Sequence, residues 1–249
     1  MKKTILFLMV FAFCNSCTKP SECVESFGAT ILKEVAVTPF TVIRVYRGIE
    51  LQITQGTEYK VQIQAGENFI DNIEVNQTGN EISFKDNTSC NWVRDYGQTK
   101  ILITAPNIVD IYSKTERDIN SVGTLTFPII RLYAFDKDGD GLPGAGTGDF
   151  HFNVNNSQVV IQGNNVARFF VSGTTDLALM SLYFGDGRIE AENLYAKSID
   201  VYHRGSNDMI VRPTEAISGT MVSTGNIILK NNPPVNTVQQ LYTGHLIYP

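Results

Sequence analysis

Apolar and polar residues alternate along much of the chain, and this alternation predicts a succession of β-strands. In the segment 49–54, Ile49, Leu51 and Ile53 alternate with polar neighbours, and the segment 59–65 repeats the pattern. A period of two places one set of side chains on the core side of a strand. No apolar pattern of helical spacing persists, so the sequence predicts an all-β protein. Further strands in the amino-terminal half of the chain are expected at 40–47, 81–85 and 100–105.

From residue 149 to the end, shorter strands follow one another at intervals of roughly ten residues, so two strands would make one coil of about twenty. Similar glycine-containing turns recur at 185–189, 205–210 and 223–228. Even spacing with small turn residues suits either a β-sandwich or a stacked β-solenoid. Stacked coils place like turns above one another, and the recurring turn therefore favours the solenoid.

The amino-terminal residues have the layout of a secretory signal, with two lysines followed by an apolar run at 5–13. This run is too short to cross a bilayer as a helix. Cys17 follows Ser16 directly after the run, as a lipoprotein signal requires, while Cys14 inside the run is a competing position.

We therefore expect a lipoprotein signal peptide at 1–16, lipidation of Cys17 and a tether at 17–38. The protein would then be exported and anchored by lipid in the cell envelope, at the periplasmic or outer side of the outer membrane. An ordinary secretion signal with incidental cysteines is the alternative.

Composition narrows the classes of partner. The formal net charge of −5 and the pI of about 5.2 leave no basic stripe to neutralise phosphates, so nucleic acid is excluded as an expected partner. Hydrophobic residues make up 43% of the chain, which is enough for a packed core.

The mature chain would retain Cys23 and Cys90, and two cysteines in an exported protein invite one disulfide; two separate thiols are the alternative.

Three segments carry a resemblance to a known family: IELQITQGTEYKVQIQAGENFIDNIEV, EISFKDNTSCNWVRDYGQTKILITAP and FGDGRIEAENLYAKSIDVYHRGSNDMIV. They resemble the autotransporter-adhesin head GIN domain proteins of Bacteroidetes lipoproteins. The repeats VSGTTDL, HRGSNDM and STGNII are looser versions of the SGSGDI pattern of that family. The resemblance implies a right-handed, single-stranded β-helix-like solenoid at 39–249, with antiparallel strands at its amino-terminal end, and no established activity.

The family segment CNWVR includes a cysteine, which supports a disulfide between Cys23 and Cys90. Such a bond would join the tether to the early strands and stabilise the fold by about 2–4 kcal/mol. Alkylated protein of equal mass with and without prior reduction would exclude it.

The motifs of several enzyme classes are absent from the sequence. It contains neither the G-x-S-x-G nucleophile elbow nor the H-E-x-x-H zinc pattern. GDGLPG at 139–144 matches a dinucleotide-binding spacing, but no helix is expected after it. His151, His203 and His245 are scattered, and we expect strand or end-cap residues rather than metal ligands.

Asp149, Asp176, Asp186 and Asp208 occupy expected turns, where aspartate commonly bonds the nearby backbone. Glycosidases of β-helix type would need two of them roughly 5–10 Å apart, and solvated turns are the favoured interpretation.

Aromatic residues recur on the expected strands. Phe169 and Phe170 are neighbours and must point to opposite faces, so one of them can face outward. Tyr183, Phe184 and Tyr202 are further candidates for an exposed aromatic platform that binds sugars, with packing in the core as the alternative.

Asp136, Asp138 and Asp140 alternate and Gly141 follows, as in the first half of a calcium loop. Thr147 stands where the bidentate glutamate is expected. A weak structural calcium site is one hypothesis and a solvated glycine-rich turn is the alternative. A melting temperature unchanged by millimolar calcium would exclude the site.

These observations predict a non-catalytic binding or adhesion module for a glycan or a protein, held at the membrane by its lipid. A glycan-active enzyme on the same scaffold and a structural envelope lipoprotein are the alternatives.

Overall fold

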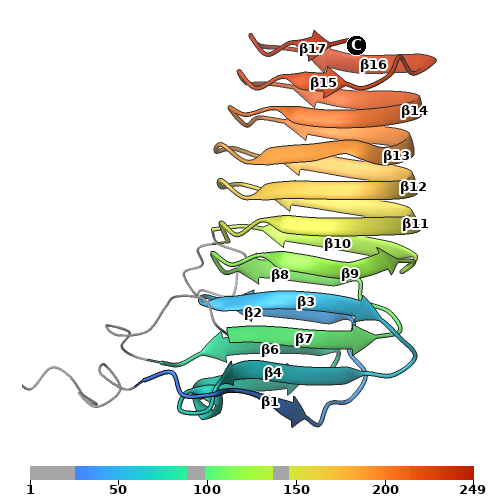
Figure 1. Cartoon of the computed structure of the whole chain (residues 1–249). Coiled ribbons are helices and arrows are strands. Elements are labelled where there is room, and N and C mark those ends of the chain that lie inside the picture. Colours follow the sequence, from blue (N-terminus) through green and yellow to red (C-terminus); the bar gives the residue numbers. More distant parts are fainter. Residues whose placement is uncertain (1–25, 89–98, 137–145) are drawn as a thin grey trace, which may run out of the picture.

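The computed structural model describes residues 26–88, 99–136 and 146–249, and within these ranges the protein is all-β, as predicted. The strands form one sheet, and Figure 1 shows them layered along one axis. Within the same ranges no helix has the length and apolar character needed to cross a bilayer. The elements are β1 (Thr30–Val35), β2 (Val42–Tyr46), β3 (Ile49–Gln55), β4 (Lys60–Gly66), the 3-10 helix η1 (Ile70–Asn72), β5 (Ile73–Thr78), β6 (Glu81–Asp86), β7 (Thr99–Ala105), β8 (Asp110–Lys114), β9 (Ile119–Leu125), β10 (Ile129–Ala134), β11 (Phe150–Gly163), β12 (Arg168–Leu182), β13 (Arg188–His203), β14 (Met209–Met221), β15 (Ile227–Leu229), β16 (Val235–Gln240) and β17 (Leu246–Ile247).

The carboxyl-terminal half is a stack of parallel strands. β11 pairs with β12, β12 with β13 and β13 with β14, in each case along most of the strand. Phe150, Phe169, Ile189 and Met209 are successive register partners, so one layer corresponds to 19 or 20 residues. The expected spacing of about twenty residues is therefore confirmed for these layers.

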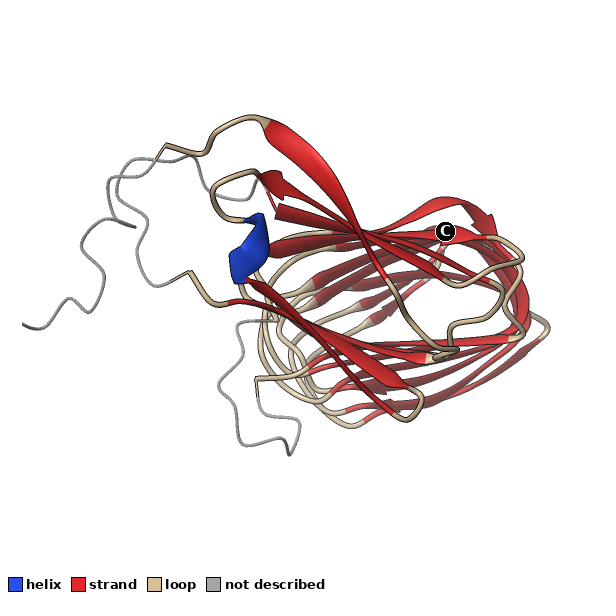
Figure 2. Cartoon of the chain, turned by 90° about the horizontal axis from the view of Figure 1, so that it is seen from below, coloured by secondary structure: helices blue, strands red, loops and turns tan. Residues whose placement is uncertain are grey.

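Each long strand bends near its middle and serves two faces of the stack. The first half of β11 pairs with β9 and its second half pairs with β10. The segments 150–154 and 158–163, which alternation predicts as two strands, are therefore one strand that turns a corner. We call the side formed by β9 and the first halves of β11, β12, β13 and β14 the first face. The side formed by β10 and the second halves of these four strands is the second face. Figure 2, viewed along the stack, shows the two faces enclosing the interior.

The amino-terminal strands are interleaved with later ones. β2 pairs in parallel with both β6 and β8, and β3 pairs in parallel with both β7 and β9. The pairs β1–β4, β4–β7 and β5–β6 are antiparallel, which confirms the predicted antiparallel strands at this end. β1 lies within the segment that the sequence suggested as a tether and runs along the edge of β4.

The core is built from columns of inward side chains, one from each layer. Phe150, Phe169, Ile189, Met209 and Ile227 are register partners in successive layers and are fully buried. The rings of the first two stack with centroids 4.7 Å apart and planes 18° apart. Removing a buried phenylalanine side chain typically costs about 3–5 kcal/mol, so such columns supply much of the cohesion between layers.

Two glycines permit close approach between layers. Gly173 lies opposite Val154 with a φ of +104°, and Gly219 lies opposite Val201 with a φ of +118°. A Cβ atom at Gly173 would stand 2.0 Å from the Val154 carbonyl oxygen, and one at Gly219 would stand 1.9 Å from that of Val201. Only glycine satisfies both the backbone conformation and the contact at these positions.

A histidine is buried at the end of one of the long strands. His203, at the end of β13, is only 1% exposed, and neither imidazole nitrogen has a hydrogen-bond partner among the described residues. Burial lowers the pKa of His203, while the nearby backbone of Asn207 and Asn226 and the Asp208 carboxylate act in the opposite direction to a smaller extent. The imidazole is therefore held neutral in the folded protein.

We predict that Gly173→Ala lowers the free energy of unfolding by about 1–3 kcal/mol, in addition to its backbone strain, because the new methyl group overlaps a carbonyl oxygen. Gly79→Ala is the matched control, since Gly79 also has a positive φ, of +59°, but no atom lies within 4 Å of its Cβ position. Urea unfolding of both variants measures the difference. Equal losses of stability would contradict the proposed contact.

We also predict that acidification destabilises the protein through His203. The unfolded imidazole takes up a proton near its ordinary pKa of 6.5 and the folded one does so only at lower pH, so this contribution is present above pH 6.5 and is lost as the pH falls below it. Melting temperatures from pH 7.5 to 5 should fall less for His203→Gln than for the native protein. His245→Gln, at an exposed position, should keep the native pH dependence; a His203→Gln curve parallel to the native one would refute the assignment.

Candidate functional site

An aromatic strip runs along the second face, and its members come from four strands or their ends. The rings of Tyr112 and Tyr133 stack with centroids 4.5 Å apart, and that of Phe135 lies 6.1 Å from that of Tyr183. Phe184 is 49% exposed, which is high for so large an apolar side chain. The strip consists of Tyr112, Tyr133, Phe135, Tyr183, Phe184 and Tyr202.

Parallel register explains why these rings meet. Tyr112 of β8 is the partner of Tyr133 of β10, and Tyr133 is the partner of Gln162 of β11. The shorter amide side chains of Gln162 and Asn164 lie among the rings and line, with them, a shallow groove of about 630 Å³. The groove therefore combines flat apolar surface with a few amide groups, the usual composition of a ligand site.

The charges beside the strip are paired. The Arg44 guanidinium lies 4.3 Å from the Tyr112 ring centroid and donates to both carboxylate oxygens of Glu81, at 3.2 and 3.3 Å. Asp110 Oδ1 lies 3.2 Å from Arg131 Nη1. Burial raises the pKa of Asp110, and the positive charge of Arg131 opposes this rise.

Burial also raises the pKa values of the Tyr112 and Tyr133 phenols, so both hydroxyls stay protonated at physiological pH. The strip therefore offers neutral rings and neutral hydroxyl groups beside balanced charges.

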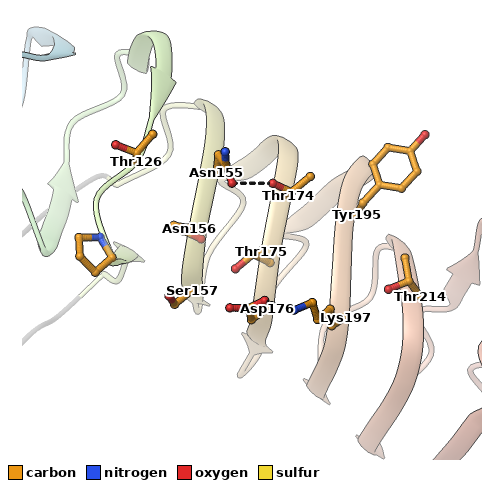
Figure 3. A pocket seen from close by; sticks show the side chains of 11 residues that line it. Thr126, Asn155, Asn156, Ser157, Thr174, Thr175, Asp176, Tyr195, Lys197 and Thr214 are labelled. Atoms are coloured by element: carbon orange, nitrogen blue, oxygen red, sulfur yellow. Dashed lines mark hydrogen bonds and ion pairs between the residues drawn. The ribbon is translucent and has the colours of Figure 1, made fainter.

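A second concave surface lies where β11, β12 and β13 bend from the first face to the second. We call it the corner groove; it has a volume of about 580 Å³, and most of the residues that line it have polar side chains. Figure 3 shows Asn155, Thr174 and Tyr195 on successive strands, with the Thr174 hydroxyl donating to Asn155 Oδ1 over 2.9 Å. Lys197 Nζ and Asp176 Oδ1 form an ion pair of 2.7 Å in the same groove.

The four turn aspartates do not all lie together. Asp176 lies at the bend, and Asp186 lies in a loop at the opposite edge, where it accepts a hydrogen bond of 2.7 Å from Ser206. Asp149 and Asp208 occupy the same position three layers apart, about 14 Å at the usual strand spacing, with Arg168 and Arg188 between them. Asp208 is paired with Arg188 at 3.2 Å.

The histidines are also separate. His151 is outward on β11 and stacks on Phe170 of β12 with centroids 4.7 Å apart, whereas His203 is buried and His245 is exposed. No group of three or more metal-ligating side chains occurs within the described residues. Phe169 is buried while Phe170 faces outward, which confirms that the two point to opposite faces.

Several predicted site residues lie outside the described ranges, so the hypotheses on them stay predictions: the lipidation site Cys17, the disulfide pair Cys23 and Cys90, and the calcium ligands Asp138 and Asp140. Asp136 is described, and its backbone N–H donates to Asn164 Oδ1 over 2.9 Å.

Sequence reasoning selected Tyr183, Phe184 and Tyr202 but missed Tyr112, Tyr133, Phe135 and Tyr195. The sequence does carry a repeated pattern that includes Tyr112 and Tyr133. A charged residue, an aliphatic residue and a tyrosine follow one another at 110–112 and again at 131–133, 21 residues apart, which is close to one layer. Tyr195 has no such partner, since Thr174 and Arg212 stand opposite it.

Solved structures of similar fold come from Bacteroides and Parabacteroides species. An adhesin of Bacteroides fragilis NCTC 9343, named as putative, matches with a TM-score of 0.76 at 23% identity, over 89% of this chain and 97% of its own. A protein of Parabacteroides distasonis ATCC 8503 named as a putative lipid binding protein matches with a TM-score of 0.62 at 13% identity, over 88% of this chain and 97% of its own.

A third structure, named as a putative adhesin of Parabacteroides merdae ATCC 43184, matches with a TM-score of 0.60 at 12% identity, over 89% of this chain and 97% of its own. These identities establish a shared fold and nothing about the ligand. No curated protein matches this chain at a significant level. Residues 39–233 match a family profile over most of the chain, and the protein therefore belongs to the family described as "Putative auto-transporter adhesin, head GIN domain".

Proposed function

We propose that this protein is a non-catalytic binding module of the bacterial cell envelope, which binds a glycan or a protein through its aromatic strip. The observation that carries the proposal is the exposure of adjoining rings on a rigid sheet, beside the amides of Gln162 and Asn164. Tyrosine supplies a large contact area at a low cost in conformational entropy and is enriched among the hot spots of protein interfaces. The same rings can pack against the apolar faces of sugars while amides bond their hydroxyls.

The scaffold supports this role. We infer that its layers form a right-handed, single-stranded β-helix-like solenoid, because consecutive strands pair in parallel and such crossover connections are right-handed in nearly all proteins. A crystal structure of the mature chain would reveal the hand of the coil directly. Binding groups on strands of this kind are held more rigidly than groups on loops.

A catalytic role is less well supported by the carboxylates. Asp176, Asp208 and Glu190 are each paired with a basic side chain, at 2.7, 3.2 and 2.5 Å, so none of the three is a free carboxyl group facing a substrate site. Cleavage of an envelope or host polysaccharide that is lost in Asp176→Asn would contradict the non-catalytic proposal.

Anchoring through Cys17 is the second part of the proposal. It is supported by the apolar run at 5–13 and the small Ser16 before the cysteine. A lipidated terminus would hold the protein at the outer membrane, on its periplasmic or its outer side, and leave the binding strip in the aqueous phase.

We predict that Cys17→Ser moves the protein from the membrane fraction to the soluble fraction, because an acylated amino terminus with two or more chains anchors stably. Fractionation of cells expressing the native and the variant chain measures this, with Cys14→Ser as the matched control that should stay with the membrane. Retention of Cys17→Ser in the detergent-extracted fraction would exclude Cys17 as the anchor.

We predict that Tyr183→Ala weakens ligand binding about tenfold or more, since truncation of a central aromatic contact commonly costs over 1 kcal/mol. A glycan array and a protein pull-down with the native protein identify the ligand, and titration then compares the variants. Tyr242→Ala is the control, because Tyr242 is 63% exposed but lies between β16 and β17 and does not line the groove of the strip. Unchanged affinity for Tyr183→Ala would exclude the strip as the binding surface.

A further inference from the structure

The bends of successive layers build the corner groove from one repeated arrangement. Each bend has three residues, of which the middle one is more enclosed than the two beside it: Phe127, Thr175 and Ala196 are buried and Asn156 is half-buried. The residues on either side point outward because side chains alternate along a strand. The bends therefore present two outward columns with a groove between them, and Figure 3 shows the columns on neighbouring strands.

The first column is a row of register partners. Asn155 stands opposite Thr174, and Thr174 stands opposite Tyr195. The second column consists of Ser157 and the ion-paired Asp176 and Lys197. Because neighbouring strands are about 4.8 Å apart, the groove offers a new set of polar groups at intervals close to the length of one sugar ring in an extended chain. A linear glycan that lies along the stack would meet one set per ring.

Tyr195 provides an exposed flat surface at one end of the groove. Ala191 and Tyr195 pair with Val211 and Arg212, so β13 has three residues more than β14 at this point. Such bulges often re-aim a side chain at a binding site. Tyr195 is 52% exposed, which leaves much of its ring accessible.

Arg212 supports the ring. Its guanidinium lies 5.0 Å from the Tyr195 ring centroid, and its Nε donates to the Glu192 carbonyl oxygen over 2.7 Å. An aromatic ring held in this way suits the apolar face of a pyranose.

The charge balance of the groove favours an uncharged ligand. Lys197 and Asp176 neutralise each other at 2.7 Å, and the other polar groups are hydroxyls and amides. While the Thr174 hydroxyl donates to Asn155 Oδ1, its oxygen can still accept from a sugar hydroxyl, and Asn155 Nδ2 can donate to one. Among the residues that line the groove, an acidic polysaccharide would find no excess of positive charge; Arg212, beside Tyr195, is not one of them.

We propose that the corner groove binds a linear, uncharged polysaccharide that lies along the stack with one sugar ring on Tyr195. The inference names a ligand class at a site separate from the aromatic strip, and it rests on the proposed binding function of the protein.

The test is calorimetric titration of the full-length protein in detergent with neutral linear oligosaccharides from β-glucan, mannan and xylan, and with oligogalacturonate as the acidic probe. At least one neutral hexasaccharide should bind, and more tightly than its disaccharide, because it crosses more layers. Absence of binding by every neutral hexasaccharide, affinity independent of chain length, or preference for oligogalacturonate would overturn the inference.

Variants locate the site. Tyr195→Ala should weaken hexasaccharide binding at least tenfold, Tyr195→Phe should retain it because the ring remains, and Tyr242→Ala, outside both the strip and the corner groove, should leave it unchanged. Melting temperatures confirm that each variant is folded. Loss of binding in Tyr183→Ala but not in Tyr195→Ala would overturn the corner groove while upholding the proposed function. Capture of a protein ligand that depends on Tyr183, with no oligosaccharide binding at all, would likewise refute only the corner groove.

Discussion

The structure depends on one constraint, the in-register parallel stacking of successive layers. Each inward side chain must fit directly on the side chain at the same position in the layer below, as Phe150 fits on Phe169. Backbone hydrogen bonds between strands fix the register. In this register the inward columns remove apolar surface from water, which stabilises the stack. Glycine at position 173 follows from the same constraint, because the carbonyl of Val154 comes too close for any side chain.

Stacking in register also organises the surface. An outward residue at one position is followed by an outward residue at the same position in the next layer, so a surface feature becomes a column rather than a point. The stacked rings of Tyr112 and Tyr133 are one result, and the row of Asn155, Thr174 and Tyr195 is another. Irregularities of register then shape these columns. The extra residues of β13 before Tyr195 interrupt a uniform surface and give the corner groove its aromatic end.

The same geometry weakens the case for catalysis on this scaffold. Carboxylates brought into one column meet basic side chains in that column, as Asp208 meets Arg188 and Asp176 meets Lys197. The Asp176–Lys197 pair is largely solvent-exposed and contributes little to stability, but both pairs neutralise charge along the stack. A long, rigid face with balanced charges and exposed rings is better suited to holding an extended ligand than to polarising a bond.

The sequence by itself determined the all-β class, the repeat of about twenty residues and the opposite directions of Phe169 and Phe170, because alternation with a period of two is a local property of a strand. It also contained the family resemblance that the match over 39–233 bears out. Alternation could not decide which strands become neighbours. The insertion of β2 between β6 and β8 joins residues 39 and 68 positions away along the chain, and only the tertiary structure places them together. For the same reason Phe135 and Tyr183 meet only in the folded protein, and the exposure of Tyr195 follows from a bulge that exists only relative to the neighbouring strand. Binding surfaces built from columns depend on register between layers, and register is set by pairing over long separations rather than by the residues beside each ring.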